Sequence, residues 1–261
     1  MKSGSVGYDV VGNIAILKFD RSAKSSDKRR FADKYLKENK NVRTVLEKTE
    51  KFKGRLRTLR TKYISGEKNK EALYKENSCE FRFNVETCYF SPRLSSERKE
   101  LAEEVKKNEK VLVMFGGVAP FAIVIAKYSK ANKVFSVELG RECSKYAEIN
   151  VKRNKLQNRV EIVQGDVRKK IPLLKEKFDR IVMARPNLKD SFLDVAFKVV
   201  KRSGTIHYYG FYKEDEKNQM KDLILSEAKR ARKKIKISKL KKAGDIGPYK
   251  FRYRADFKVL N

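Results

Sequence analysis

Apolar and amphipathic segments alternate from residue 95 to the end of the chain. Short apolar runs such as KVLVMF, residues 110–115, predict buried strands, and segments with apolar positions three or four residues apart predict helices. The expected strands span residues 110–115, 133–138, 159–164, 178–184, 204–210, 233–240 and 249–259, and the expected helices span 95–107, 119–129, 140–154, 187–202 and 213–232. Strands that alternate with helices indicate a mainly parallel, doubly wound α/β sheet. The last two strands follow each other across the turn residues GDIGP and are expected to pair antiparallel.

The first part of the chain shows a different pattern. Segment 8–19 predicts a hairpin that turns at Gly12-Asn13, segment 27–40 predicts an amphipathic helix, and segments 41–48, 56–64 and 81–90 predict strands. No low-complexity linker separates this part from the rest, so the boundary is expected within SPRLSS, residues 91–96. We therefore expect a small α+β module, residues 1–92, followed by an α/β domain, residues 93–261.

The charge of the chain points to a polyanionic partner. There are 64 Lys and Arg against 33 Asp and Glu, which gives a formal net charge of +31. Self-repulsion on this scale is tolerated when the usual partner is a polyanion, either nucleic acid or an anionic membrane. Two runs, KFKGRLRTLRTK (51–62) and KRARKKIKISKLKK (229–242), contain no acidic residue, although a solvated lysine-rich surface is the plainer interpretation. The hydrophobic fraction of 40% is ample for a core and excludes a disordered polycation.

Other features exclude several classes of protein. No apolar run reaches the ~18 residues that cross a bilayer, and no apolar segment typical of a signal peptide is present, so no membrane-spanning segment is expected. Cys79, Cys88 and Cys143 show no pairing pattern and are expected to be reduced thiols of a cytoplasmic protein. The single histidine, His207, has no Cys or His cluster beside it, so no metal site is expected.

Three expected strands end in residues that suit an adenosine ligand. The strand 110–115 leads into Gly116-Gly117, where the backbone can approach a ligand closely before a helix begins. The next strand ends at Glu138, whose carboxylate can accept both ribose hydroxyls, and the third ends at Gly165-Asp166, where a side chain can reach an adenine amine. Ligands of doubly wound sheets bind at such strand ends. The alternative is that Glu138 and Asp166 only cap the helices that follow.

Phosphate-binding motifs are missing from the chain. Neither GxGxxG nor GxxxxGK[ST] occurs, which disfavours NAD and ATP as ligands. S-adenosylmethionine has an adenosine part but no phosphate, and it needs neither motif.

A set of motifs carries a family resemblance. YFSPRLSSER, VLVMFGGVAPF, VFSVELG, VQGDVR, IVMARP and GTIHYY resemble the archaeal and eukaryotic tRNA guanine-37 N1-methyltransferases, a class I family that uses S-adenosylmethionine. TVLEKTEKFKGRLRTLRTKYISGEKN resembles the second domain of the same family, so the resemblance covers essentially the whole chain. The family's additional N-terminal domain, which contacts the tRNA elbow, is not expected, because no segment matches it.

The resemblance implies a fold, a cofactor and a partner. The fold would be a class I methyltransferase domain, with a mainly parallel seven-stranded sheet and an antiparallel last strand, preceded by a small α+β RNA-binding module. The cofactor would be S-adenosylmethionine, with no metal. The partner would be the anticodon loop of tRNA at position 37, no membrane would be bound, and the protein would be a monomer.

The resemblance also assigns roles to single residues. Arg57 stands where the family has an arginine that steadies guanine O6, Glu97 matches a proposed general base, and Tyr89 matches an aromatic that lines the donor or base pocket. Guanine N1 holds a proton that a carboxylate must take as the methyl group arrives, and a guanidinium suits the negative charge that then builds on O6. Plainer roles are a phosphate contact for Arg57, a favourable charge in the first helical turn for Glu97, and core packing for Tyr89.

The remaining site residues form two groups. Those expected to bind the cofactor are Tyr89, Phe115, Gly116, Gly117, Val118, Glu138, Leu139, Asp166, Val167 and Ala184. Those expected to contact RNA are Lys53, Arg55, Arg60, Arg93, Pro186 and Asn187.

Three positions depart from the family pattern. Val113 replaces an acidic residue, Ala119 replaces the second loop glycine, and Ala184 replaces the asparagine of an Asn-Leu-Pro motif. Such changes either broaden the substrate pocket, for example toward C7 of the tricyclic wyosine precursor, or weaken catalysis. Three functions stay open: methyl transfer to tRNA position 37, aminocarboxypropyl transfer in the wyosine pathway, and RNA binding on a degenerate fold without catalysis. The presence of Arg57 and Glu97 favours the first.

Overall fold

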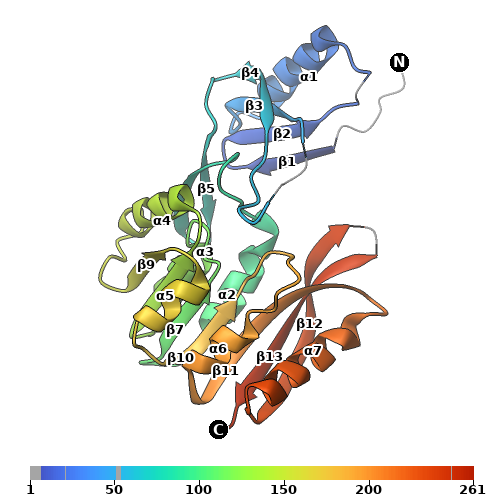
Figure 1. Ribbon diagram of the computed structural model, residues 1–261. Helices are drawn as coiled ribbons and strands as arrows, with labels where there is room; N and C mark the ends of the chain where they lie inside the picture. Colours follow the sequence, from blue (N-terminus) through green and yellow to red (C-terminus); the bar gives the residue numbers. More distant parts are fainter. Residues whose placement is uncertain (1–6, 21, 51–53, 248) are drawn as a thin grey trace. The chain divides into compact units, whose positions relative to one another are not determined.

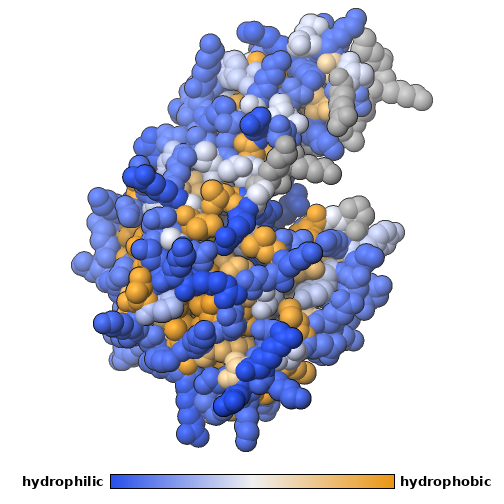
Figure 2. Space-filling model, in the orientation of Figure 1, coloured by the Kyte–Doolittle hydropathy of each residue, from blue (hydrophilic) through white to orange (hydrophobic). Residues whose placement is uncertain are grey.

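A computed structural model of the chain describes residues 7–20, 22–50, 54–247 and 249–261. The chain divides into two compact units, Met1–Pro92 and Arg93–Asn261, which we describe separately (Figure 1). Hydrophilic residues cover most of the surface seen in Figure 2, as expected for a net charge of +31. No helix among the described residues is long and apolar enough to cross a membrane.

The first unit is built on a four-stranded sheet with the order β1-β2-β3-β4. Its elements are β1 (Gly7–Val11), β2 (Ile14–Lys18), α1 (Ser25–Glu38), β3 (Thr44–Lys48) and β4 (Thr61–Gly66). β1 and β2 form the predicted hairpin, and α1 connects β2 to its parallel neighbour β3. Ala15 and Leu17 on β2 pack with Ala32 on α1 and Val45 on β3 to form the core of this unit. The predicted hairpin and helix are therefore confirmed.

The second half of this unit differs from the prediction. β5 (Glu71–Glu76) and β6 (Cys79–Asn84) form a separate two-stranded sheet. The predicted strand 56–64 is wrong in its first half, because Arg57 has a left-handed φ of 53° that a strand does not allow, and β4 begins only at Thr61. β5 was not predicted, since its sequence EALYKE has charges at half of its positions.

The second unit contains a seven-stranded sheet with the order β12-β13-β11-β10-β7-β8-β9. Its strands are β7 (Lys110–Met114), β8 (Lys133–Glu138), β9 (Val160–Gln164), β10 (Phe178–Met183), β11 (Val200–Lys213), β12 (Ile235–Gly247) and β13 (Lys250–Val259). The five strands from β7 to β11 pair in parallel, whereas β13 runs antiparallel between β11 and β12. This confirms the predicted class I methyltransferase fold. The strand order reverses between β7 and β10, which is where such sheets bind ligands.

Helices cover both faces of this sheet (Figure 1). They are α2 (Ser95–Glu104), α3 (Pro120–Tyr128), α4 (Arg141–Arg153), α5 (Val167–Leu173), α6 (Leu193–Val199) and α7 (Lys217–Arg230), after a short 3-10 turn, Pro92–Leu94. Tyr208 of β11 lies in one core cluster with Leu193 of α6 and Met220 of α7, whereas its neighbour Tyr209 hydrogen-bonds to Glu97 of α2. Adjacent residues of a strand point to opposite faces, so α2 lies opposite α6 and α7.

Several predicted boundaries in this unit are wrong. The strand expected at 233–240 continues to Gly247, through most of the expected turn, and the helix expected from residue 213 begins at Lys217. The helix expected from residue 187 begins at Leu193, because residues 184–190 form a loop. Gly204 was expected to end a helix, but it lies within β11, which already begins at Val200.

Candidate functional site

The loop between β7 and α3 turns sharply at the carboxyl end of the sheet. Phe115, Gly117 and Ala119 all have left-handed backbone, with φ of 62°, 56° and 66°. A Cβ on Gly116 would lie 2.1 Å from Ser136 Oγ on β8, so the close packing of this loop on β8 depends on glycine. The predicted Gly116-Gly117 turn therefore has a conformational reason in the structure.

Ala119 shows why the family pattern favours glycine at its position. A left-handed backbone costs an L residue about 1–2 kcal/mol, and Ala119 occupies that region at the start of α3. Asn150 of α4 supports the same loop, since its Nδ2 donates to the Val118 carbonyl at 3.2 Å, and both residues are fully buried. The hydrogen bond from Asn150 thus helps to hold the loop in the conformation that places Ala119 in the left-handed region.

Glu138 ends β8 and holds two loops through its carboxylate. Oε2 accepts the Gly117 N–H at 2.8 Å, and Oε1 accepts the Gly140 N–H at 2.7 Å. The Leu139 N–H also hydrogen-bonds to this carboxylate, so three backbone donors leave about one of its four acceptor positions for a ligand hydroxyl. Burial raises the pKa of the Glu138 carboxyl, against the opposing effect of the backbone N–H donors.

The third strand end lies beside Glu138. Gly165 has a φ of 138°, and its N–H donates to the Glu138 carbonyl at 2.7 Å. Asp166 caps α5 by accepting the Arg168 N–H at 2.9 Å, as the plainer interpretation expected. Glu138 pairs with Gln164 in the parallel register of β8 and β9. The structure therefore brings the glycine loop, Glu138 and Asp166 to neighbouring strand ends.

The other predicted cofactor residues of this unit surround the same strand ends. Val118 and Val167 are buried, and Leu139 is half-buried. Phe115 packs edge-to-face on Phe192, with ring centroids 5.0 Å apart. Ala184 is half-buried and directly follows β10.

The first turn of α2 places Glu97 in a network of cations. Its Oε2 accepts from Arg254 Nη1 at 2.9 Å and from the Tyr209 hydroxyl at 3.1 Å, and its Oε1 lies 2.5 Å from Lys241 Nζ. Arg254 is fully buried and also bonds to Glu100. Against the effect of burial, hydrogen bonds from Lys239 and Lys241 and the charge of Arg254 hold the pKa of Glu100 at about 2. Sequence reasoning found Glu97 but missed Arg254, Tyr209 and Lys241.

Arg57 and Tyr89 form a stacked pair in the first unit. The guanidinium carbon of Arg57 lies 3.5 Å from the centroid of the Tyr89 ring, a cation–π contact. The backbone bends beside this pair, since the Arg57 N–H donates to the Gly54 carbonyl at 3.1 Å and the Leu59 N–H donates to the Glu86 carbonyl at 2.7 Å. Tyr89 is half-buried.

The predicted RNA-contacting cations occupy different surroundings. Arg55, Arg60 and Arg93 are exposed, and Arg60 lies 3.7 Å from Glu50. Lys53 lies outside the described residues.

The loop after β10 is held by a residue that sequence reasoning missed. Arg185 is buried and donates through Nη2 to the carbonyls of Leu188 and Asp190, the latter at 2.6 Å. Its guanidinium carbon lies 5.5 Å from the centroid of the Tyr208 ring. Pro186 and the exposed Asn187 lie on the part of the loop that Arg185 closes. A basic residue two positions after a buried strand was the available signal.

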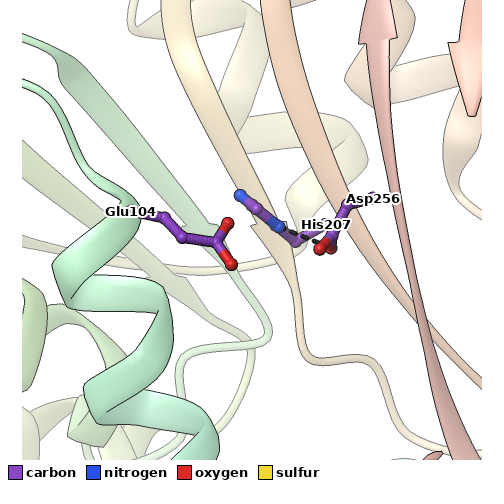
Figure 3. Close-up of side chains that lie close together, drawn as sticks. All are labelled: Glu104, His207 and Asp256. Carbon is purple, nitrogen blue, oxygen red and sulfur yellow. Dashed lines mark hydrogen bonds and ion pairs between the residues drawn. The ribbon is translucent and has the colours of Figure 1, made fainter. Parts of the chain in front are cut away.

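Glu104, His207 and Asp256 have their potential ligand atoms within 4.8 Å of one another, the spacing of a metal site (Figure 3). His207 Nδ1 lies 2.6 Å from Asp256 Oδ1, and Nε2 lies 2.6 Å from Arg180 Nη1. Burial lowers the pKa of His207, so a neutral ring donates to Asp256 and accepts from Arg180. Arg254 pairs with Asp256 at 2.9 Å. The guanidinium groups of Arg180 and Arg254 thus already bond to His207 and Asp256, and their charges would repel a metal ion.

Comparisons with known proteins give one consistent family. The profile of the TRM5/TYW2 methyltransferase domain matches residues 72–240, and that of the TYW2 N-terminal domain matches residues 2–69. The tRNA (guanine(37)-N(1))-methyltransferase Trm5b of Pyrococcus abyssi is 37% identical over 80% of this chain, which spans 61% of that relative. The tRNA (guanine(37)-N(1))/4-demethylwyosine(37)-methyltransferase Taw22 of Nanoarchaeum equitans is 34% identical over 98% of this chain and 100% of its own length.

Solved structures of the same family resemble the whole chain. The crystal structure of Pyrococcus abyssi Trm5b has a TM-score of 0.87 and 32% identity, and covers 98% of this chain and 75% of its own. The complex of aTrm5 with tRNALeu has a TM-score of 0.85 and 25% identity, with 98% and 72% covered. The Methanocaldococcus jannaschii TYW2 structure in complex with AdoMet has a TM-score of 0.75 and 25% identity, with 98% and 100% covered.

Proposed function

Because the chain belongs to the TRM5/TYW2 methyltransferase family, we propose that it transfers a methyl group from S-adenosylmethionine to N1 of guanosine 37 in tRNA. Relatives named for this reaction match most of the chain, and a solved relative contains tRNALeu. The observation that carries the proposal is Glu138, held by the Gly117 N–H beside the glycine loop at the strand ends.

The residues at these strand ends fit an adenosine cofactor. The Glu138 carboxylate accepts from the backbone of Gly117, Leu139 and Gly140, and it keeps about one of its four acceptor positions for a ribose hydroxyl. The left-handed backbone at Phe115 and Gly117 turns the chain sharply at the carboxyl end of β7. S-adenosylmethionine would supply an electrophilic methyl group on its sulfonium. A solved relative, TYW2 of Methanocaldococcus jannaschii, is in complex with this compound.

Glu97 is the proposed acceptor of the N1 proton. Its Oε2 is occupied by Arg254 and Tyr209, whereas the only contact of Oε1 among the described residues is Lys241. Oε1 therefore has one acceptor position for the proton of guanine N1. Arg57 is the proposed partner of O6, and its stacking on Tyr89 fixes the plane of the guanidinium.

A second substrate is proposed on a specific match. Taw22, which is named for both guanine-37 and 4-demethylwyosine methylation, is matched over its entire length. Ala184 replaces the asparagine of the family pattern at the start of the loop after β10, and Arg185 holds this loop through a hydrogen bond to the Asp190 carbonyl. We include C7 of the tricyclic wyosine precursor at position 37 as the second methyl acceptor.

The test uses S-adenosylmethionine labelled in two places. Transcripts of one tRNA, with guanosine or adenosine at position 37, are incubated with methyl-labelled or carboxyl-labelled cofactor. We expect only the methyl label to enter RNA, and only in the guanosine transcript. Incorporation of the carboxyl label would show aminocarboxypropyl transfer, and no incorporation from either cofactor would contradict methyl transfer to guanosine 37.

A further inference from the structure

Three strands of the second unit continue beyond the carboxyl end of β10. The pairing of β10 with β11 ends at Met183 and Tyr208, whereas β11 and β13 remain paired as far as Lys213 and Lys250. We call residues 209–213, 241–247 and 250–254 the extension; its strands β11, β12 and β13 can be followed in Figure 1. It lies at the end of the sheet that carries Glu138.

One face of the extension can be identified from its register. Tyr209 pairs with Arg254, Phe211 pairs with Arg252, and Lys213 pairs with Lys250. Directly opposed residues share a face, and so do alternate residues of one strand. Tyr209 and Arg254 both bond to Glu97, so this face, here called the extension face, is the one on which the proposed base lies.

Arg252 lies at the centre of the extension face without an anionic partner. It is only 7% exposed, and its guanidinium carbon lies 5.4 Å from the Phe211 ring centroid. Within the described part of the chain, no carboxylate or carbonyl accepts from this guanidinium, whereas Arg254, two residues on, pairs with Glu97, Glu100, Glu104 and Asp256. A buried charge is costly unless it is paired, which indicates that the partner of Arg252 comes from outside the chain.

Two exposed lysines add charge beside Arg252. Lys213 and Lys250 stand directly opposite each other, and like charges in this arrangement destabilise a sheet. Glu216, at 3.8 Å, is a distant counterion for Lys213. Next to Lys250, the ring of Tyr249 is 83% exposed, where it can stack on an unpaired base. Positive charge with an exposed aromatic suits single-stranded nucleic acid better than a small anion.

We propose that the extension face binds backbone phosphates of the substrate RNA beside the target nucleotide, with Arg252 as the central contact. A guanidinium binds phosphate through two parallel hydrogen bonds, and Lys213 and Lys250 flank it as point charges. The phosphate pairs the buried charge of Arg252 and relieves the repulsion between the two lysines. This inference rests on the proposed function, since it assigns part of the same RNA substrate to this surface.

The test is the salt dependence of tRNA binding, measured by filter binding of a guanosine-37 transcript at several salt concentrations. Loss of one phosphate contact lowers the slope of log K against log salt by about 0.7–0.9. Arg252→Gln should show this decrease, and the double variant Lys213→Gln/Lys250→Gln should show about twice as much. Arg202→Gln is the matched control, because Arg202 is exposed at the opposite end of β11 and should keep the wild-type slope.

The outcomes separate the inference from the proposed function. Binding of S-adenosylmethionine should be unchanged in every variant, which shows that the second unit is folded. If Arg252→Gln unfolds early, the double variant of exposed lysines decides the question alone. A wild-type slope in the folded variants overturns the inference, and the proposed function fails separately if the wild-type enzyme does not methylate the guanosine transcript.

Discussion

Replacing Glu138 by glutamine tests the cofactor site at a single carboxylate. Glutamine keeps the size of the side chain but offers one acceptor oxygen and one amide donor. The Gly117 and Gly140 N–H groups now donate to the two carboxylate oxygens at 2.8 Å and 2.7 Å, and the amide of glutamine would face one of these N–H groups. A ribose hydroxyl would also lose a charged acceptor. Hydrogen bonds to charged groups contribute about 1.5–3 kcal/mol, and a tenfold change in Kd corresponds to about 1.4 kcal/mol. We therefore expect S-adenosylmethionine to bind about 10- to 150-fold more weakly.

The assay is isothermal titration calorimetry of S-adenosylmethionine into the wild type and the variant. Glu161→Gln is the matched control, because Glu161 lies near the start of β9, away from the strand ends, and pairs with Lys133 at 3.5 Å. The control should bind like the wild type. A Glu138→Gln variant that binds within twofold of the wild type would refute the assignment. If its melting temperature also fell, Glu138 would serve only to hold the loop.

Three further predictions concern catalysis and stability. Glu97→Gln should lower kcat for methyl transfer by about 10²–10⁴-fold, whereas Glu100→Gln, in the same ion-pair network, should keep it. Arg57→Lys should lower kcat at saturating tRNA, because an ammonium lacks the planar fork, and Arg55→Lys should not. Burial lowers the pKa of His207, so the unfolded chain takes up a proton before the folded chain does as the pH falls below about 6.5. The free energy of unfolding of the wild type should therefore decrease below this pH. Urea denaturation should show a smaller decrease for His207→Gln.

Each of these predictions has a distinct contrary result. Equal losses of kcat in Glu97→Gln and Glu100→Gln would mean that Glu97 only supports the ion-pair network. A change in the tRNA dissociation constant but not in kcat would make Arg57 a phosphate contact. Parallel pH profiles of unfolding for the wild type and His207→Gln would show that His207 does not titrate differently in the two states.

The arrangement of β7, β8 and β9 could be predicted because local pattern and tertiary environment agree. β7 and β8 are apolar runs buried on both faces, and β9 is a partly exposed edge strand. Parallel strands end at one edge of the sheet, so Gly116, Glu138 and Asp166 were expected near one another. The hydrogen bond from the Gly117 N–H to Glu138 fits this arrangement, because β7 and β8 are neighbours in the sheet and their ends lie close together.

The surroundings of Glu97 could not be predicted in the same way. Arg254 lies 157 residues further along the chain, and its face depends on the register of β13 with β11. The register of β12 shifts between Ile237 and Lys239 and again between Lys242 and Asp245, so alternation along the sequence does not show which lysines meet α2. Residues 187–190 of the loop after β10 were likewise taken for the start of a helix, because the sequence does not show that the Arg185 side chain bonds to the carbonyls of Leu188 and Asp190.

The most direct test of the proposed function is the identity of the nucleoside made at position 37. A guanosine-37 tRNA is treated with wild-type enzyme and S-adenosylmethionine, digested to nucleosides, and analysed by chromatography and mass spectrometry against methylguanosine standards. We predict 1-methylguanosine, and on tRNA carrying the tricyclic precursor a product methylated at C7. A methyl group on any other atom of guanosine 37, or on another nucleotide, would contradict the account of Glu97 and Arg57.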